Sequence, residues 1–510
     1  MHGYELEYKN EHTVKMEVHN MIETQRPKLE LLSVALIKKI VEEAFVLLER
    51  EGVFIENKEA LSLFEEAGMK VDASSQSVHI TSQLIEDSLS STPSTIKMYD
   101  RDVKHEYILG GDEVHFDPGS VAVTILDSES QAERKAVTQD LIRYTHLTDC
   151  LEHLHFQSTG ILSTDVSEAI ADSYRMYIGL QYSTKPMVTG TFRVEGFRPM
   201  HQMLVAVRGS EKALAEKPLA IFDACPSPPL KWSNLTAQSL IDSARAGIPS
   251  ELIPMGMTGA TSPATLSGTL VQHVAENLSG LVICQLAKKG APVIFGGCPV
   301  SFDMRRGTTP IGAIETLMID TGYIQIGKYL NLPTHTYMGM SDAKITDAQA
   351  GFETGIGVIM AALSGANVIS GAGILDFIRC QSLEKMVIDN QICGMAYRLI
   401  KGIAQRDDPI ALDLYENFTA DTHFLAMPHT RKWFREEQTY PQLIDRDPYD
   451  IWVSLGRKSI VSRAKEEMEN LLQKNPAPLL QKDISKELRE IMLADARNCG
   501  IPSLPEVDYS

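Results

Sequence analysis

Residues 251–297, ELIPMGMTGATSPATLSGTLVQHVAENLSGLVICQLAKKGAPVIFGG, contain two short apolar runs separated by a segment of helical length. Ser262 and Pro263 predict the N-cap and first turn of a helix, and Gly290 follows its expected end. Buried parallel strands are continuous apolar runs, and a crossover helix connects each strand to the next. The segment therefore predicts a strand–helix–strand unit of an α/β fold.

Seven apolar runs recur at the spacing of roughly 30 to 40 residues that a strand, a helix and two loops require. They are LHFQSTG from 154, PMVTGTF from 186, PLAIFDA from 218, ELIPMGM from 251, APVIFGG from 291, LPTHTYMG from 332 and ANVISGAG from 366. Thr346 and Gln349 predict a capping box at the start of another intervening helix, which Gly365 ends. The pattern predicts a (β/α)8 TIM barrel over residues 131–447, with HFLAMPHT at 423–430 as a candidate for the eighth strand.

The flanking regions differ in pattern from the barrel. LSVALIKKIVEEAFVLLEREG and KEALSLFEEAGMK, which end near Gly52 and Gly68, have helical apolar spacing, and residues 96–127 alternate in a way that predicts β-hairpins. Residues 1–130 are therefore expected to form a helical and hairpin region. Residues 448–510 are expected to form C-terminal helices with charged outer faces.

Composition excludes several classes of protein. The formal net charge of −19, from 48 basic and 67 acidic side chains, opposes binding to nucleic acid or anionic lipid. The seven cysteines form no C-x-x-C pair, and the chain shows neither a signal peptide nor an apolar run of membrane-spanning length. We therefore expect a cytoplasmic protein without nucleic-acid or membrane partners.

Residues that follow the predicted strands are the candidates for a site, because barrel enzymes bind substrate at the C-terminal ends of their strands. These positions are rich in glycine, methionine, threonine and aromatic residues. No G-x-S-x-G, P-loop, H-E-x-x-H or dinucleotide-binding motif follows a strand. Hydrolase, nucleotide-dependent and zincin chemistries are therefore not indicated.

Four segments in order along the chain carry a family resemblance. They are HFDPGS (115–120), VTQDLIRYTHLTDCLEHLHF (137–156), THTYMGMSDAKITDAQAGFETG (334–355) and HTRKWFREEQTYPQLIDRD (429–447). From about residue 30 to 480 the sequence resembles the trimethylamine methyltransferase family. The resemblance implies a (β/α)8 barrel that methylates the cobalt of a corrinoid held by a separate protein.

One departure from the family bears on the substrate. The founding trimethylamine enzymes carry pyrrolysine near the segment that corresponds to 334–342, whereas this sequence has only standard residues. The resemblance therefore implies the branch that demethylates quaternary amines, with glycine betaine as the first choice and proline betaine, carnitine and γ-butyrobetaine as alternatives. A quaternary nitrogen leaves as a neutral tertiary amine, here dimethylglycine, so the enzyme must mainly desolvate and orient the methyl donor.

These demands predict an aromatic, acid-poor pocket around the cation. The substrate-binding candidates are Phe116, Phe222, Tyr337, His335 and Arg305, and Phe192, Phe302 and Arg306 are further possibilities. Tyr337 is the first choice for the cation, and His335 or Arg305 for a carboxylate. His335 and Asp342 are the candidates for a catalytic role, and Asp223 is a further candidate for stabilising the cation. Each of these residues also has a structural interpretation, as a core aromatic, a satisfied histidine or a turn cap.

The corrinoid is expected to come from a cognate corrinoid protein, and no tightly bound cofactor or metal is expected. The docking region is predicted near 296–306 and 338–350. The candidates for facing the corrinoid are Gly296, Gly297, Met338, Gly339, Gln349 and Gly351. A homo-oligomer is expected from base rates alone.

Two other functions remain open at this point. Cys225, Cys298 and His335 all follow predicted strands and suggest a zinc-dependent methyltransferase as an alternative. A non-catalytic module that binds betaines or the corrinoid protein would need the same pocket. A zinc measurement and a methyl-transfer assay separate these alternatives.

Overall fold

The computed structural model describes residues 22–505, with the exception of residues 73, 120 and 479. Its described residues divide into two compact units. Residues 22–27 and 398–439 form the smaller unit, and residues 28–397 and 440–505 form the larger one. The predicted boundaries near residues 130 and 447 stay a prediction.

The smaller unit contains a short 3-10 helix, η3 (Leu412–Tyr415), and helix α13 (Pro428–Glu437). Asp407 joins the loop to α13 by an ion pair with Lys432 and by accepting a hydrogen bond from the Trp433 indole. Residues 423–430 form no strand, because α13 begins at Pro428. The prediction of an eighth strand at HFLAMPHT is therefore wrong.

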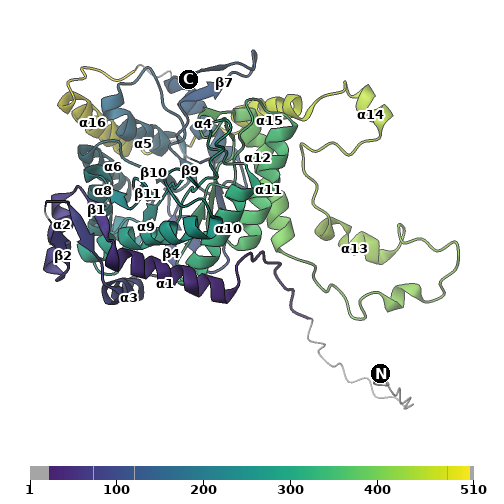
Figure 1. Ribbon diagram of the computed structural model, residues 1–510. Helices are drawn as coiled ribbons and strands as arrows, with labels where there is room; N and C mark the ends of the chain where they lie inside the picture. The colour runs from purple at the N-terminus through teal and green to yellow at the C-terminus, as the bar shows by residue number, and fades with distance from the viewer. Residues whose placement is uncertain (1–21, 73, 120, 479, 506–510) are drawn as a thin grey trace, which may run out of the picture. The chain divides into compact units, whose positions relative to one another are not determined.

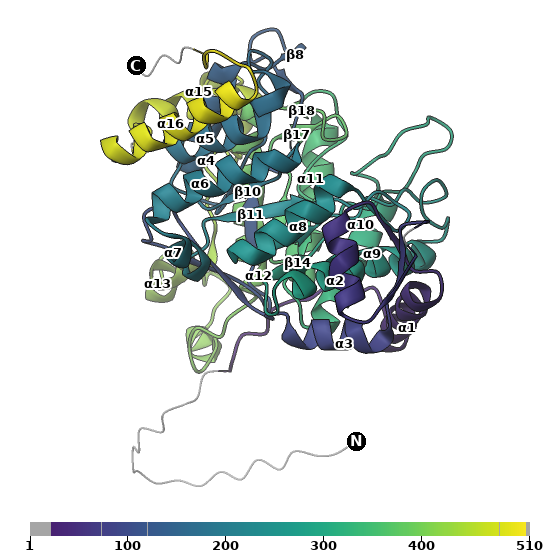
Figure 2. The same ribbon diagram turned by 90° about the vertical axis from the view of Figure 1, so that its left-hand side faces the viewer.

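The N-terminal part of the larger unit begins with the predicted helices, which are confirmed as α1 (Val34–Arg50) and α2 (Lys58–Glu66), followed by α3 (Ser82–Ser91). A small sheet in the order β12-β1-β3-β2 accompanies them. Its strands are β1 (Val53–Ile55), β2 (Lys70–Asp72), β3 (Ser77–His79) and β12 (Lys231–Trp232). Helix α1 packs along the long helix α9 (Figures 1 and 2).

Strands β4 (Ile96–Tyr99) and β5 (Glu106–Leu109) form an antiparallel hairpin, as predicted. The next segment does not form a second hairpin of this kind, because β6 (His115–Asp117) pairs in parallel with β16 (Val368–Ser370). Strands β7 (Thr124–Leu126) and β8 (Glu133–Lys135) are antiparallel and join β17 (Ile374–Leu375) and β18 (Cys380–Gln381) in a separate sheet.

Each of the seven predicted apolar runs contains a strand, and all of them pair in parallel. The strands are β9 (Gln157–Ser158), β10 (Met187–Thr189), β11 (Ala220–Ala224), β13 (Ser250–Leu252), β14 (Val293–Phe295), β15 (His335–Thr336) and β16. They form a five-stranded sheet, β14-β13-β11-β10-β9, and a three-stranded sheet, β15-β16-β6. The fold is thus mixed α/β, with eight parallel strands in two sheets rather than in one continuous sheet.

Helices connect the parallel strands, and helix α8 packs against β11 (Figure 2). They are α4 (Thr138–Cys150), α5 (Ala171–Tyr182), α6 (Phe197–Arg208), α7 (Glu211–Glu216), α8 (Asn234–Ala246), α9 (Leu266–Ala287), α10 (Ile314–Tyr329), α11 (Ala348–Ser364) and α12 (Leu383–Ile400), with short 3-10 turns η1 (Glu168–Ile170) and η2 (Val194–Gly196). The predicted C-terminal helices are α14 (Tyr449–Ser454), α15 (Ile460–Lys474) and α16 (Lys482–Asn498). Helix α16 packs against α5 and α6, and α15 against α4.

No described helix is both long enough and apolar enough to cross a membrane.

Two predicted helix starts are displaced. The N-cap of α9 is Thr265, which accepts a hydrogen bond from the Gly268 amide, rather than Ser262. The N-cap of α11 is Asp347, so Thr346 and Gln349 form no capping box. Gly365 does end α11 in the left-handed conformation, as predicted.

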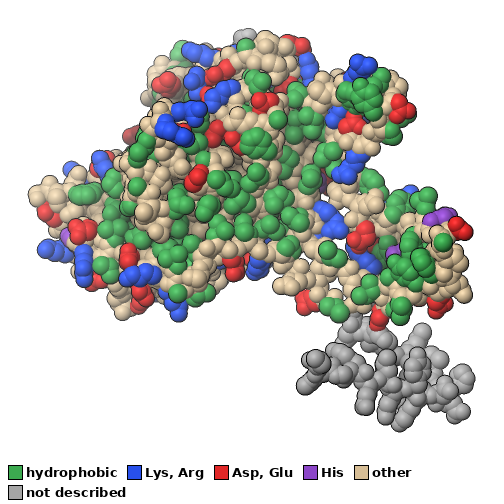
Figure 3. Space-filling view, turned by 45° about the vertical axis from the view of Figure 1, so that its right-hand side comes forward, with side chains coloured by type: hydrophobic (Ala, Val, Ile, Leu, Met, Phe, Trp, Pro, Cys, Tyr) green, Lys and Arg blue, Asp and Glu red, His purple; other side chains and the backbone are tan. Residues whose placement is uncertain are grey.

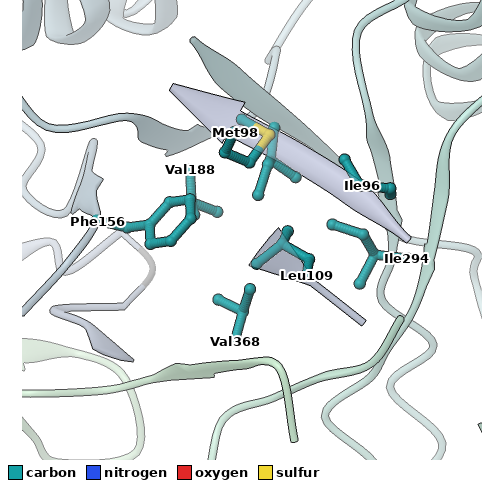
Figure 4. Close-up of a cluster of buried hydrophobic side chains, with 8 residues drawn as sticks. Ile96, Met98, Leu109, Phe156, Val188, Ile294 and Val368 are labelled. Atoms are coloured by element: carbon teal, nitrogen blue, oxygen red, sulfur yellow. The ribbon is translucent and has the colours of Figure 1, made fainter. Parts of the chain in front are cut away.

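An apolar layer lies between the β4–β5 hairpin and the parallel strands (Figure 4). Ile96, Met98 and Leu109 of the hairpin contact Phe156, Val188, Ile221, Ile294 and Val368. The hairpin thus covers one end of the strands with apolar side chains. The polar side chains lie farther along each strand, toward its C-terminal end.

Candidate active site

The register of the strands determines which side chains follow the apolar layer. Successive residues of a strand face opposite sides, so Asp223 lies on the same side of its strand as Ile221, and Ser370 on the same side as Val368. Asp117 is the register partner of Ser370, and Glu251 is the register partner of Asp223. The strands therefore bring Asp117, Asp223, Glu251 and Ser370 to one side, toward their C-terminal ends.

Buried polar side chains from four parallel strands, β6, β16, β15 and β13, contact one another in a row, which we call the polar chain. The Ser370 hydroxyl donates to Asp117 Oδ2 at 2.6 Å, and its oxygen lies 2.8 Å from Nε2 of His335. On the other edge of the imidazole, Nδ1 lies 2.8 Å from Oε1 of Glu251, although these atoms are not aligned as in a good hydrogen bond. The Gly119 amide donates to Asp117 Oδ1 at 2.6 Å.

The proton positions in this chain follow from its donors. Because the serine proton goes to Asp117, Ser370 must accept the proton of His335 Nε2. Burial lowers the pKa of His335 to about 4, so the ring is neutral and Nδ1 carries a lone pair. Burial and the nearby Asp117 raise the pKa of Glu251 well above its usual range. Burial also raises the pKa of Asp117, although the hydrogen bonds from Ser370 and the Gly119 amide act in the opposite direction. The direction of the hydrogen bond from Ser370 therefore assigns the negative charge to Asp117 and a protonated oxygen facing Nδ1 to Glu251.

Asp223, Cys225 and Tyr337 lie beside this chain. Burial, to which the negative charge of Asp117 adds, raises the pKa of Asp223 well above its usual range, although the residue is partly exposed. Cys225 has an exposed surface, while burial of its thiol raises its pKa to about 12. The pKa of Tyr337 is raised by burial and by the same carboxyl groups.

Arg175 of α5 is the buried guanidinium near these carboxyl groups. Its Nη1 donates to the Thr159 carbonyl and its Nε to the Ala171 carbonyl, and the ring of Phe192 lies 4.5 Å away. Burial lowers its pKa to about 10, while Asp172 and Asp223 act in the opposite direction. Within the described chain, no carboxylate lies within ion-pair distance of Arg175.

Because successive residues of a strand face opposite sides, the predicted aromatic residues do not all lie at the polar chain. Tyr337 packs edge-on against His335, with ring centres 4.7 Å apart, and so lies at the polar chain. Phe116 and Phe222 face the other side of their strands, where they pack against Tyr397 and Phe197. Phe192 covers Arg175, whereas Phe302 lies in the loop after β14 with its amide bonded to Thr258.

The predicted polar residues are also separated. His335 is fully buried in the polar chain. Arg305 is 86% exposed and pairs with Asp303, as does Arg306, so neither lies beside the carboxyl groups. Asp342 accepts hydrogen bonds from the Ile311 and Gly312 amides, and burial raises its pKa to about 6. Its observed role is to hold the loop before α10.

The residues expected to face the corrinoid fall into two groups. Gln349 and Gly351 are exposed on the first turn of α11. Gly296, Gly297, Met338 and Gly339 are buried. A side chain at 296 would come within 3.1 Å of His335 Nδ1, and one at 297 would overlap His273, so these glycines make room for internal neighbours. Only the exposed pair is available to a partner without rearrangement.

No three His, Cys, Asp or Glu side chains of the described residues lie in an arrangement that could hold a metal ion. Cys225 is exposed, Cys298 is buried, and His335 bonds to Ser370 through Nε2 while its Nδ1 faces Glu251. The arrangement of these three side chains does not support the zinc alternative.

The site is acid-rich, so the expectation of an acid-poor pocket is wrong. The sequence interpretation named Asp223 but missed Asp117, Glu251, Ser370 and Arg175. Asp117 and Glu251 had a usable signal, since each is a single acid within an apolar strand run, HFD and ELI. Arg175 had none, because all twelve residues of α5 are buried and the helix shows no polar face.

A family model described as "Trimethylamine methyltransferase (MTTB)" matches residues 5–499. The chain belongs to the trimethylamine methyltransferase family. It is therefore a methyltransferase.

Curated relatives within this family differ in the substrate that their names give. A trimethylamine methyltransferase of Desulfitobacterium hafniense (strain DSM 10664 / DCB-2) is 34% identical over 446 residues, which are 87% of this chain and 90% of that protein. A glycine betaine methyltransferase of Desulfitobacterium hafniense (strain Y51) is 29% identical over 477 residues, 93% of this chain and 98% of that protein. The trimethylamine methyltransferase of Methanosarcina barkeri (strain Fusaro / DSM 804) is 30% identical over 449 residues, 86% of this chain and 90% of that protein.

Among solved structures, the monomethylamine methyltransferase of Methanosarcina barkeri aligns with a TM-score of 0.49. The alignment covers 89% of this methyltransferase and 90% of that chain at 11% identity.

Proposed function

We propose that this methyltransferase moves a methyl group from a quaternary amine, glycine betaine in the first place, to the cobalt of a corrinoid held by a separate protein. The tertiary amine, dimethylglycine, is released. The relative named for glycine betaine and the absence of pyrrolysine support a quaternary substrate. The names of the other relatives make trimethylamine the first competing substrate to test.

The observation that carries the proposal is the polarity of the site. A buried guanidinium, Arg175, lies without a carboxylate partner in the described chain, close to the carboxyl group of Asp223. Glycine betaine is a zwitterion, so its carboxylate matches Arg175 and its trimethylammonium group matches Asp223 and the ring of Tyr337. Trimethylamine has no carboxylate and would leave the guanidinium without an anionic partner.

We also propose that the eight parallel strands close into a (β/α)8 barrel. At one junction of the two sheets, Phe295 at the end of β14 bridges in parallel to Thr334 before β15. At the other, the Phe116 carbonyl of β6 accepts hydrogen bonds from the amides of His155 and Phe156 before β9. The pairs β14-β15 and β6-β9 would then complete the ring, with the site at its C-terminal mouth.

The partner is proposed to dock beside the first turns of α10 and α11. Hydrophobic side chains gather across the face shown in Figure 3. The exposed hydrophobic residues of α10 and α11 include Ile314, Met318, Phe352 and Ile356. Exposed apolar groups of this kind suit a protein partner, and Gln349 and Gly351 lie between them in sequence. A cytoplasmic location is also proposed, because the seven cysteines are free thiols, which suits a reducing compartment.

The corrinoid would supply the cobalt nucleophile, and this chain's residues bind, orient and desolvate the amine. Arg175 holds the carboxylate, which fixes the direction in which the quaternary nitrogen points. Asp223 and Tyr337 hold the cation, and the apolar layer below excludes water from one side. Aligned donor and nucleophile reduce the entropy that the reaction must lose at the transition state.

The test is the visible spectrum of the protein mixed with a reduced cognate corrinoid protein and challenged in turn with glycine betaine, proline betaine, carnitine, γ-butyrobetaine and trimethylamine. We expect conversion of cobalt(I) to methyl-cobalt(III) with glycine betaine. Conversion with trimethylamine alone would overturn the choice of substrate. Conversion with none of them, with a corrinoid protein proven active, would favour the binding-module alternative.

A variant sharpens this test. Arg175→Gln should raise the KM for glycine betaine by about 10-fold to 100-fold, because a charge-assisted pair is lost. Arg208→Gln is the matched control, since the Arg208 guanidinium is also removed from water but donates to the backbone carbonyls of Tyr99, Asp100, Arg101 and Lys217. An equal change of KM in both variants would show that Arg175 acts only through stability.

A further inference from the structure

Three carboxyl groups share one desolvated region of the larger unit. Asp117 and Glu251 are fully buried, whereas Asp223, the register partner of Glu251, is partly exposed. The titratable and charged groups that act on Asp223 come from several elements. They are Asp117 of β6, Arg175 of α5, Cys225 after β11, Glu251 of β13, and Tyr337 in the loop after β15.

The polar chain accounts for the protons of two of these carboxyl groups. The direction of the hydrogen bonds, from His335 to Ser370 and from Ser370 to Asp117, places a proton on Glu251. Asp117 is left as a carboxylate that accepts hydrogen bonds from Ser370 and the Gly119 amide. The charge of Asp117 is thus already satisfied by two short hydrogen bonds of 2.6 Å. Asp117 therefore needs no ligand, and Glu251 faces Nδ1 of His335 at 2.8 Å.

Asp223 is the third carboxyl group and has no such arrangement. Its Oδ1 is buried without a hydrogen-bond partner among the described residues, and no described cation lies within ion-pair distance. Burial and repulsion from Asp117 favour a neutral Asp223 when no ligand is bound, and together they outweigh the opposing effect of Arg175. A permanent positive charge beside it would favour the carboxylate instead.

We propose that the site binds a quaternary ammonium group in exchange for a proton released from Asp223. The O–H bond of Asp223 breaks, the proton passes to the solvent, and the carboxylate pairs with the cation. A quaternary nitrogen cannot donate a hydrogen bond, so its recognition depends on this charge and on the ring of Tyr337. The choice of glycine betaine as the cation rests on the proposed function.

The exchange is measured by isothermal titration of glycine betaine into the full-length protein near pH 7, in two buffers of different protonation enthalpy. The dependence of the heat on the buffer gives the number of protons released. We expect about one proton per bound ligand. Binding with no buffer dependence, or no binding at all, would overturn the proposal.

A ligand without the cation and two variants provide the controls. The carbon isostere 3,3-dimethylbutanoate has the same shape and carboxylate but no positive charge, so it should bind without releasing a proton. Asp223→Asn should abolish the release, whereas Asp242→Asn should leave it unchanged. Asp242 is a suitable match because burial also raises its pKa, while it lies on α8 and bonds to Gln238. Proton release that persists in Asp223→Asn would assign the exchange to another group and overturn the proposal.

A second measurement applies if Asp223→Asn does not fold. In the unaltered protein, the affinity for glycine betaine should rise by about tenfold per pH unit while Asp223 is protonated. The affinity for 3,3-dimethylbutanoate should not rise in this way, and equal pH dependence of the two ligands would contradict the exchange. These binding data are independent of turnover. Proton release without methyl transfer would therefore remove the proposed function and keep the exchange.

Discussion

Oε1 of Glu251 lies 2.8 Å from Nδ1 of His335, and both side chains are fully buried. A carboxylate and an imidazole lone pair at this distance would repel each other, so one proton must lie between them. The opposite edge of the ring donates to Ser370, which assigns this proton to Glu251.

Glu251→Gln tests the protonated state directly. Glutamine is the neutral isostere of a protonated glutamate, and its amide can donate to His335 Nδ1. We expect the free energy of unfolding to change by less than about 1 kcal/mol, whereas Glu251→Ala should cost about 2–4 kcal/mol through a cavity and an unsatisfied ring nitrogen. Chemical denaturation of both variants measures this difference. Equal losses in the two variants would mean that Glu251 is ionised in the folded protein.

Gly296→Ala tests the space that the imidazole needs. A Cβ at 296 would lie 2.9 Å from the Leu252 carbonyl oxygen and 3.1 Å from His335 Nδ1. We expect a loss of about 1–3 kcal/mol in the free energy of unfolding. Gly355→Ala in α11 is the control, since nothing lies within 4 Å of its Cβ, and it should stabilise by about 0.5–1 kcal/mol. If Gly296→Ala leaves the free energy of unfolding unchanged, the backbone after β14 can shift at little cost.

The strands of the fold were predictable because their signal is local. Seven apolar runs each contain one of the parallel strands. The strand β6 was not recognised, because HFD is short, is followed by Pro118 and Gly119, and becomes a strand only by pairing with β16, which is distant in sequence. Non-local pairing of this kind leaves no periodicity to detect.

The helix starts were misplaced because several residues near each start can cap. Thr261, Ser262 and Thr265 precede α9, and tertiary contacts decide among them: Thr261 Oγ1 accepts from the Met257 amide, while Ser262 contacts Thr269. Thr265 is left to cap the helix. Asp223, His335 and Tyr337 were among the candidates because they lie at or after the ends of predicted strands, whereas the single acids within apolar runs, Asp117 and Glu251, were overlooked. Arg175 was hidden in a helix that is buried on every side.

Asp342→Asn should reveal a pH-dependent cost of burying a carboxylate. Burial raises the pKa of Asp342 from 3.8 to about 6, so between about pH 4 and pH 6 the folded state binds more protons than the unfolded state. The contribution of Asp342 to the free energy of unfolding therefore falls as pH rises through this window, by about 3 kcal/mol in total. Above about pH 6 the full cost remains.

The measurement compares the unfolding free energies of the two proteins between pH 4.5 and pH 7.5. Asparagine can still accept from the Ile311 or Gly312 amide, so the loop contact is largely kept. We expect Asp342→Asn to gain stability relative to the unaltered protein as pH rises. A difference that is constant across the range would contradict the raised pKa.

Tyr337 is expected to contribute its ring rather than its hydroxyl to the binding of glycine betaine. Tyr337→Phe should bind the ligand within about twofold of the unaltered protein, whereas Tyr337→Ala should weaken binding by about 2-fold to 30-fold through loss of the cation–π contact. Calorimetric titration gives both affinities. Because Tyr337 is buried, the fold of the alanine variant is checked first by thermal unfolding. A large loss in Tyr337→Phe would assign the role to the hydroxyl instead.

Gly351 separates docking of the partner from binding of the amine. It is exposed on the first turn of α11, and a Cβ at this position would meet no atom within 4 Å, so Gly351→Trp should fold normally. If the corrinoid protein docks on this surface, the bulky side chain should lower methyl transfer by about tenfold at low partner concentration. Excess partner should restore the rate, and calorimetry should show unchanged binding of glycine betaine. Lys486→Trp on α16, another exposed helix, should change neither quantity. A normal rate for Gly351→Trp at every partner concentration would place the docking surface elsewhere. A loss of rate that excess partner cannot restore would indicate damage to the site itself.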